Sequence, residues 1–175
     1  KKLNKVVLSR ETELKLSAPV TGESLLSKWQ QLDDNGYLFL LKFGQDSFVG
    51  NSPECLYKKA GRLLYTEALA GTVPRGHKHQ EEMAHQQTLL NDPKIQSEHQ
   101  LVVEYILSKI GYLAKISNLP PPLSIVKLSN IQHLCAKFSA KLNENISDED
   151  IIRHLHPPPS VCGPPSKEAH QRINQ

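Results

Sequence analysis

The chain has 175 residues, of which 38% are hydrophobic and 22% are charged, a balance that favours one packed domain over a disordered chain. The formal net charge is only +3, and the Lys and Arg residues neither cluster nor alternate with aromatic residues, so no nucleic-acid partner is expected. No apolar run is long enough to cross a bilayer and no secretory leader is recognisable, so no membrane association is expected either.

The three cysteines, Cys55, Cys135 and Cys162, are odd in number and far apart in the sequence. This spacing favours free thiols in a reducing compartment over a disulfide framework or a zinc site. We therefore expect a cytoplasmic protein, or a plastid protein if the source is a plant.

The first part of the chain predicts mainly strands. The apolar stretch 37–43 is expected to be a buried strand, and Gly71-Thr72 a turn that ends the last strand of this region. Leu25, Leu26, Trp29 and Leu32 stand at helical spacing and predict a helix over 24–32. The other expected strands are 5–10 with 13–17, 47–50, 55–59 and 62–69.

The rest of the chain predicts helices and then strands again. Asp92 followed by Pro93 is a typical helix start, and the apolar stripe behind it predicts a helix to about Ile116. Ser147, followed by three acidic residues, predicts the capped start of a short helix ending near Leu155. The remaining expected elements are helices over 78–91 and 168–175 and strands over 123–128 and 134–142. Long antiparallel strands with helices outside them indicate an α+β fold.

Glu98 is the most informative single residue for a chemical argument. It shares a helical face with Leu101, Val102 and Tyr105, and a carboxylate on an apolar stripe is costly unless it is paired, protonated or bound to a cation. The alternative is that Glu98 lies in the first helical turn, where the helix N-terminus and water tolerate its charge.

Three more residues are candidates on position alone. Glu54 stands at the head of a strand, where a carboxylate can project from a sheet edge or simply be solvated. Lys5 precedes an apolar run, and if it points inward its lowered pKa would make it a usable base; a surface lysine is the alternative. His133 lies near a strand start, where a hydrogen-bonded core histidine is the alternative to a functional one.

Six segments, in this order and at these spacings, resemble the motifs of the chorismate-utilising enzyme family and cover nearly the whole chain. They are "KVVLSR" (5–10), "GNSPE" (50–54), "TEALAGTVPRG" (66–76), "SEHQLVVEYI" (97–106), "VKLSNIQHL" (126–134) and "LHPPPSVCGPP" (155–165). Within this family the chain is most similar to isochorismate synthases of the menaquinone or salicylate type. The resemblance implies part of a two-layer antiparallel β-sandwich with helices packed on the outside.

The resemblance also implies a reaction and a role for each matching residue. Water would add at C2 of chorismate while the C4 hydroxyl leaves, with Lys5 as the base and Glu54 as the acid. Glu98 would be a ligand of Mg²⁺, which would hold a carboxylate of the substrate. The residues expected to line the chorismate pocket are Gly71, Thr72, His133, Ser160 and Gly163. A monomer is expected, with chorismate as its small-molecule partner.

Two positions separate branches of the family. Ala70 stands where aminodeoxychorismate synthases carry a lysine nucleophile, and Lys5 stands where anthranilate synthases usually lack a lysine. Both residues disfavour the ammonia-using branches, although the anthranilate branch stays an alternative. Salicylate synthases share the lysine base and stay open, because they pass through isochorismate before pyruvate is eliminated.

The chain also departs from the family pattern. Isochorismate synthases usually read His-Pro-Thr-Pro-Ala where this chain has Pro158 and Ser160 in place of Thr and Ala. The family's first segment and its C-terminal part, with a second Mg²⁺-binding Glu, have no counterpart in these residues. Residues 1–175 are thus expected to form a partial chorismate-binding domain, incomplete at both ends and inactive in isolation. A degenerate, non-catalytic chorismate-binding module is the rival interpretation.

Overall fold

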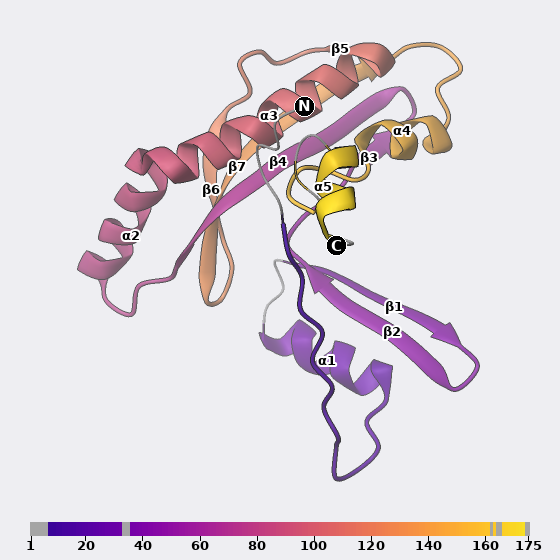
Figure 1. Ribbon diagram of the computed structural model, residues 1–175, viewed down its shortest axis with the longest axis vertical. Helices are drawn as coiled ribbons and strands as arrows, with labels where there is room; N and C mark the ends of the chain where they lie inside the picture. Colours follow the sequence, from indigo (N-terminus) through magenta and orange to yellow (C-terminus); the bar gives the residue numbers. More distant parts are fainter. Residues whose placement is uncertain (1–6, 33–35, 162, 164–165, 174–175) are drawn as a thin grey trace.

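The computed structural model describes residues 7–32, 36–161, 163 and 166–173 (Figure 1). Its helices are α1 (Gly22–Leu32), α2 (His79–Asn91), α3 (Pro93–Leu113), α4 (Asp148–Leu155) and α5 (Ser166–Ile173). Its strands are β1 (Tyr37–Phe43), β2 (Asp46–Ser52), β3 (Lys58–Ala60), β4 (Leu63–Pro74), β5 (Ala114–Ile116), β6 (Leu123–Lys127) and β7 (Ile131–Leu142). None of the described helices is long and apolar enough to cross a membrane.

Two 12-residue strands, β4 and β7, form the centre of an antiparallel five-stranded sheet. β3 pairs with the start of β4, while β5 and β6 pair with β7 on its other side. Helix α3 lies along β4 and β7, as Figure 1 shows, and buries its apolar stripe against them. The core formed there is made of alternate residues of each strand and one face of the helix, including Leu64, Ala68, Val102, Ile106, Ile110, Ala136 and Phe138. The predicted α+β class with antiparallel sheets is confirmed.

Local start signals predicted the helix boundaries well. The Asp92 side chain accepts a hydrogen bond from the Ile95 N–H at 2.9 Å and caps α3, with Pro93 as its first residue. Ser147 forms a capping box with Asp150 at the start of α4. The prediction that α3 runs to Ile116 is wrong, because residues 114–116 leave the helix and pair with the end of β7.

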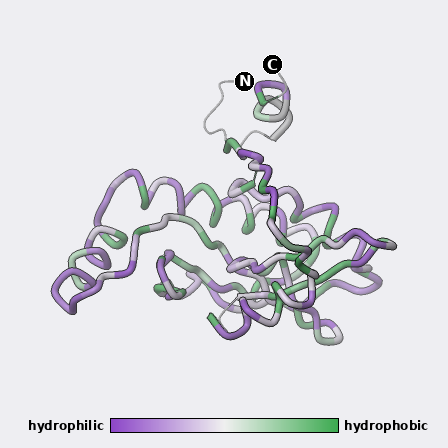
Figure 2. Tube along the Cα trace, turned by 90° about the horizontal axis from the view of Figure 1, so that it is seen from below, coloured by the Kyte–Doolittle hydropathy of each residue, from purple (hydrophilic) through white to green (hydrophobic). Residues whose placement is uncertain are grey.

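The predicted strand over 5–10 with 13–17 is also wrong for its described residues, which begin at residue 7. Residues 7–17 form no strand within the described part of the chain, and Leu8, Leu14 and Leu16 are 77%, 77% and 63% exposed. A strand needs a hydrogen-bonded neighbour, which alternation of apolar residues along one segment does not provide. Figure 2 shows that hydrophobic and hydrophilic residues are mixed along much of the chain.

The stretch 37–43 is a strand, but it is not buried as predicted. Among the described strands β1 pairs only with β2, and α1 packs against this hairpin. Leu40 lies beside Gly22 of α1, whereas Phe39, Leu41 and Phe43 on the opposite face are 38–67% exposed. The run of apolar residues therefore predicts the strand correctly, but the predicted burial of its side chains is wrong.

An ion-pair cluster around Glu82 fixes α2 to the end of the sheet where β4 and β6 end. The Glu82 carboxylate accepts hydrogen bonds from the Gly76 N–H at 2.8 Å and from Arg75 Nε at 3.0 Å, and it pairs with Lys127 Nζ at 3.0 Å. The Gly76 N–H, Lys127 and Arg75 together lower the pKa of Glu82 to about 2. Arg75 Nη1 also donates to the Leu128 carbonyl, so Arg75 is a structural residue that joins three elements.

Candidate active site

One cavity of about 440 Å³ brings together six of the eight residues predicted to form the site. They are Glu54, Gly71, Thr72, Glu98, His133 and Ser160, and they come from five separate parts of the chain: the segment after β2, then β4, α3, β7 and the segment after α4. The other lining residues are Val7, Leu8, Pro53, Leu69 and Ala70, which are almost entirely apolar. Gly163 is buried but does not line this cavity, and Lys5 lies outside the described residues.

Gly71 lies in a β-bulge and not in the predicted turn. The β4–β7 pairing runs in register to Ala70 opposite Leu134 and resumes with Thr72 opposite His133, so Gly71 is one extra residue on β4. The strand continues to Pro74. The bulge leaves Thr72 Oγ1 2.9 Å from His133 Nδ1 in the cavity wall.

The bulge needs glycine for two reasons. Its φ is +82°, a left-handed conformation that other residues adopt with strain. A Cβ at this position would also lie 2.5 Å from Ile95 Cγ2 of α3. The absent side chain therefore allows close packing of helix α3, which also carries Glu98, against β4.

We predict that Gly71→Ala destabilises the full-length protein by about 1–3 kcal/mol, the usual cost of such backbone strain, with the clash against Ile95 in addition. Urea denaturation measures the loss. Gly61→Ala is the matched control, because Gly61 has a φ of +59° but a Cβ added there would meet nothing within 4 Å. Equal losses in the two variants would show that packing against Ile95 contributes nothing.

His133 offers an unused polar atom to the cavity. Its ring is only 7% exposed, Nδ1 is bonded to Thr72, and Nε2 is buried without a hydrogen-bond partner in the described structure. Burial lowers the pKa of His133, so the ring is neutral at neutral pH. A buried polar atom without a partner is costly, and a polar group of a ligand would satisfy it.

Glu54 is held by a residue far away in the sequence. Ser160 Oγ lies 3.0 Å from Glu54 Oε1 and 3.3 Å from Oε2. Burial raises the pKa of the Glu54 carboxyl, the Ser160 hydroxyl opposes this rise, and the negative charge of Glu67 adds to it. A carboxyl with a raised pKa keeps its proton nearer to neutral pH, as a general acid requires.

Glu98 lies in the second turn of α3, beyond the first-turn position that was the alternative. Its side chain is half-buried at the cavity, and it has no hydrogen bond or ion pair with any residue that the structure describes. Carboxylate oxygens are the ligands that hard cations such as Mg²⁺ prefer. No cluster of three or more His, Cys, Asp or Glu side chains suited to a metal occurs in the described ranges.

His99 is a residue that sequence reasoning missed. It is 5% exposed, and burial lowers its pKa, while the backbone of Ala68 in β4 opposes this shift. Its Nε2 is buried without a hydrogen-bond partner among the described residues. Only the position of His99 beside Glu98 could have drawn attention to it, because the strand against which it is buried is distant in the sequence.

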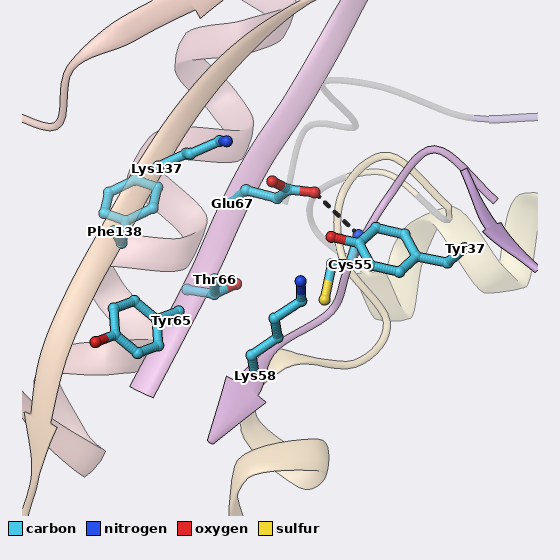
Figure 3. A pocket seen from close by; sticks show the side chains of 8 residues that line it. All are labelled: Tyr37, Cys55, Lys58, Tyr65, Thr66, Glu67, Lys137 and Phe138. Carbon is cyan, nitrogen blue, oxygen red and sulfur yellow. Dashed lines mark hydrogen bonds between the residues drawn. The ribbon is translucent and has the colours of Figure 1, made fainter. Parts of the chain in front are cut away.

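A second, smaller cavity of about 240 Å³ lies beside Glu67 and contains none of the predicted site residues (Figure 3). The Cys55 N–H donates to Glu67 Oε1 at 3.1 Å, as the dashed line in Figure 3 shows. The walls are completed by Tyr37, Lys58, Tyr65, Thr66, Lys137 and Phe138. Glu67 therefore anchors the segment that carries Glu54 and adds negative charge near it.

The sequence profile described as "Chorismate binding enzyme" matches residues 1–175, the whole chain. The chain belongs to the chorismate-binding enzyme family. This confirms the family inferred from the six sequence motifs.

Relatives within this chorismate-binding family carry similar names. The isochorismate synthase MenF of Pasteurella multocida is 35% identical over 174 residues, which are 99% of this chain and 40% of that protein. The chloroplastic isochorismate synthase 2 of Arabidopsis thaliana is 33% identical over 99% of this chain and 31% of its own length. The structure of MenF, the menaquinone-specific isochorismate synthase of Escherichia coli, matches with a TM-score of 0.80 and 32% identity, over 90% of this chain and 37% of that chain. This chorismate-binding chain thus spans well under half the length of these relatives.

Proposed function

We propose that the full-length protein is an isochorismate synthase, which converts chorismate reversibly to isochorismate. The observation that carries the proposal is the cavity that places Glu54, with its raised pKa, in one wall with Thr72 and the unpartnered Nε2 of His133. The names of the relatives described above support the same activity.

In the proposed reaction Glu54 acts as the general acid and Lys5 as the general base. Lys5 removes a proton from a water molecule as its oxygen bonds to C2 of the ring, and the two ring double bonds shift. The bond between C4 and its hydroxyl breaks, and Glu54 donates its proton so that water leaves. One water is consumed and one is released, so the product is an isomer of the substrate. Proton transfer of each kind contributes typically about 10²–10⁴-fold to a rate.

Substrate binding is assigned to the polar and apolar walls of the same cavity. His133 Nε2, buried and unpartnered, would bond a polar oxygen of chorismate, and its neutral ring adds no charge that would compete with Glu54. Leu69, Ala70 and Pro53 would contact the apolar part of the ring.

We propose Mg²⁺ as the cofactor, with Glu98 as one ligand. The carboxylate of Glu98 is half-buried at the cavity and has no partner among the described residues, which supports this assignment. Mg²⁺ commonly combines one or two carboxylates with water and substrate oxygens. When bound, Mg²⁺ would neutralise and hold a carboxylate of chorismate.

Salicylate formation is the second candidate function, because it passes through the same intermediate product. Ala70 lines the cavity with a methyl group where a lysine nucleophile stands in aminodeoxychorismate synthases, which speaks against that branch.

A product assay on the full-length protein tests the proposal. The protein is incubated with chorismate and Mg²⁺, with and without ammonium, and the products are separated by chromatography. We expect isochorismate in both cases. Salicylate with pyruvate would establish the second candidate, anthranilate would move the protein to the ammonia-using branch, and unchanged chorismate would favour a non-catalytic module.

A further inference from the structure

A hydrogen bond links two segments 106 residues apart at the proposed acid. The Ser160 hydroxyl approaches both carboxyl oxygens of Glu54, at 3.0 Å and 3.3 Å, so its proton is shared between them. Glu54 and Ser160 are both half-buried in the wall of the large cavity. The contact therefore joins the segment after β2 to the segment after α4 at the point where chemistry is proposed.

Ser160 is the one side chain of the described structure that hydrogen-bonds to the Glu54 carboxyl. Ser52 also contacts Glu54, but its hydroxyl accepts from the Glu54 N–H at 3.2 Å and donates to the Glu54 carbonyl at 3.1 Å. Ser52 thus orders the backbone of this loop, whereas Ser160 acts on the carboxyl group itself.

The other groups around the Glu54 carboxyl do not favour its ionised form. Glu67 on β4 adds negative charge nearby, Glu98 on α3 lines the same cavity, and the buried His133 on β7 is neutral at neutral pH. The remaining lining residues are largely apolar, and burial itself disfavours the carboxylate. Among the described residues the Ser160 hydroxyl is the group that stabilises the charge of Glu54.

We propose that Ser160 is a positioning residue for Glu54, whose hydroxyl fixes the direction of the carboxyl in the cavity and stabilises its deprotonated form. The inference rests on the proposed function insofar as it concerns catalysis. It follows from the hydroxyl that this chain has at position 160 and from its contact with both carboxyl oxygens of Glu54. An alanine methyl group could make no such hydrogen bond.

Loss of the Ser160 hydroxyl should shift the pH dependence of activity to higher pH. A general acid acts in its protonated form, so activity falls as pH rises through its pKa. A hydroxyl that donates to the carboxylate lowers that pKa. Removal of the Ser160 hydroxyl therefore raises the pKa of Glu54, and activity should persist to higher pH.

The test is a ¹³C NMR titration of the full-length protein labelled at its Glu carboxyl carbons, with the Glu54 signal assigned from its absence in Glu54→Gln. We expect the pKa of Glu54 to rise by about half a unit or more in Ser160→Ala and Ser160→Gly, and to stay near the wild-type value in Ser160→Thr. Ser52→Ala is the matched control and should leave the pKa unchanged. An unchanged pKa in both hydroxyl-deletion variants, or an equal rise in Ser52→Ala, overturns the proposal.

Enzyme kinetics give the second measurement. In Ser160→Ala the basic limb of the kcat profile should move to higher pH in step with the Glu54 titration, and in Ser160→Thr it should not. If wild-type protein does not convert chorismate, the proposed function fails, while the titration still decides whether Ser160 controls the Glu54 carboxyl. A titration shift without a shift of the kcat limb would contradict the catalytic part of the inference.

Discussion

In the Glu54→Gln variant of the full-length protein, kcat for isochorismate formation is expected to fall by about 10²–10⁴-fold, the usual contribution of a positioned acid. The amide has nearly the same shape and its oxygen can still accept the hydrogen bond from Ser160, which lies 3.0 Å from Glu54 Oε1. It cannot supply the proton that the leaving hydroxyl needs. The rate of isochorismate formation at saturating chorismate measures the effect.

The same variant should bind chorismate nearly as well as the wild type, because its cavity keeps its shape. A large fall in kcat with little change in the dissociation constant of chorismate, measured by calorimetry, identifies a group that acts in the chemical step. Glu144→Gln is the control for loss of one carboxylate, since the Glu144 side chain is 81% exposed. A fall in kcat of less than about threefold for Glu54→Gln would remove Glu54 from the role of acid.

The helices with local start signals were the most predictable parts of the fold. Asp92 and Ser147 satisfy free N–H groups within three residues of themselves, so the sequence around each helix start contains most of the information needed. The end of α3 depends instead on the pairing of residues 114–116 with β7, which no local pattern reveals.

Burial of strands could not be predicted from apolar runs, because burial depends on which element packs on each face. Phe39 and Leu41 lie in a strand as apolar as the core strands, yet they are 38% and 51% exposed. Gly71 shows the same limit for turns. Gly71 was expected in a turn, but the long pairing between β4 and β7 makes its position, with a φ of +82°, a bulge within a strand.

The candidate site was predictable mainly through the family resemblance. Patterns of hydrophobicity pointed only to Glu98, since a carboxylate on an apolar stripe is unusual by itself. Glu54 and Ser160 meet across 106 residues, and nothing local to either one reveals the other. Glu67 was missed for a similar reason, because it acts through the backbone of a distant segment, at Cys55.

Loss of the Glu98 carboxylate should weaken the binding of Mg²⁺. In the full-length Glu98→Gln variant, the Mg²⁺ concentration for half-maximal activity should rise by about tenfold or more, the range seen when groups supporting a metal site are lost. A neutral amide oxygen binds a hard cation more weakly than a carboxylate does. Calorimetric titration of the protein with Mg²⁺ in the absence of chorismate gives a measurement that does not depend on turnover.

The position of Glu98 makes this test specific. It follows Ile95 by three residues on α3, and Ile95 packs against the bulge at Gly71, so the fold sets the place of the Glu98 side chain at the cavity. Glu104→Gln removes the same charge from an exposed position of the same helix and should leave the response to Mg²⁺ unchanged. If both variants bound Mg²⁺ as the wild type does, Glu98 would not be a ligand, and its unpaired charge at the cavity would need another explanation, such as a cationic group of the remaining protein.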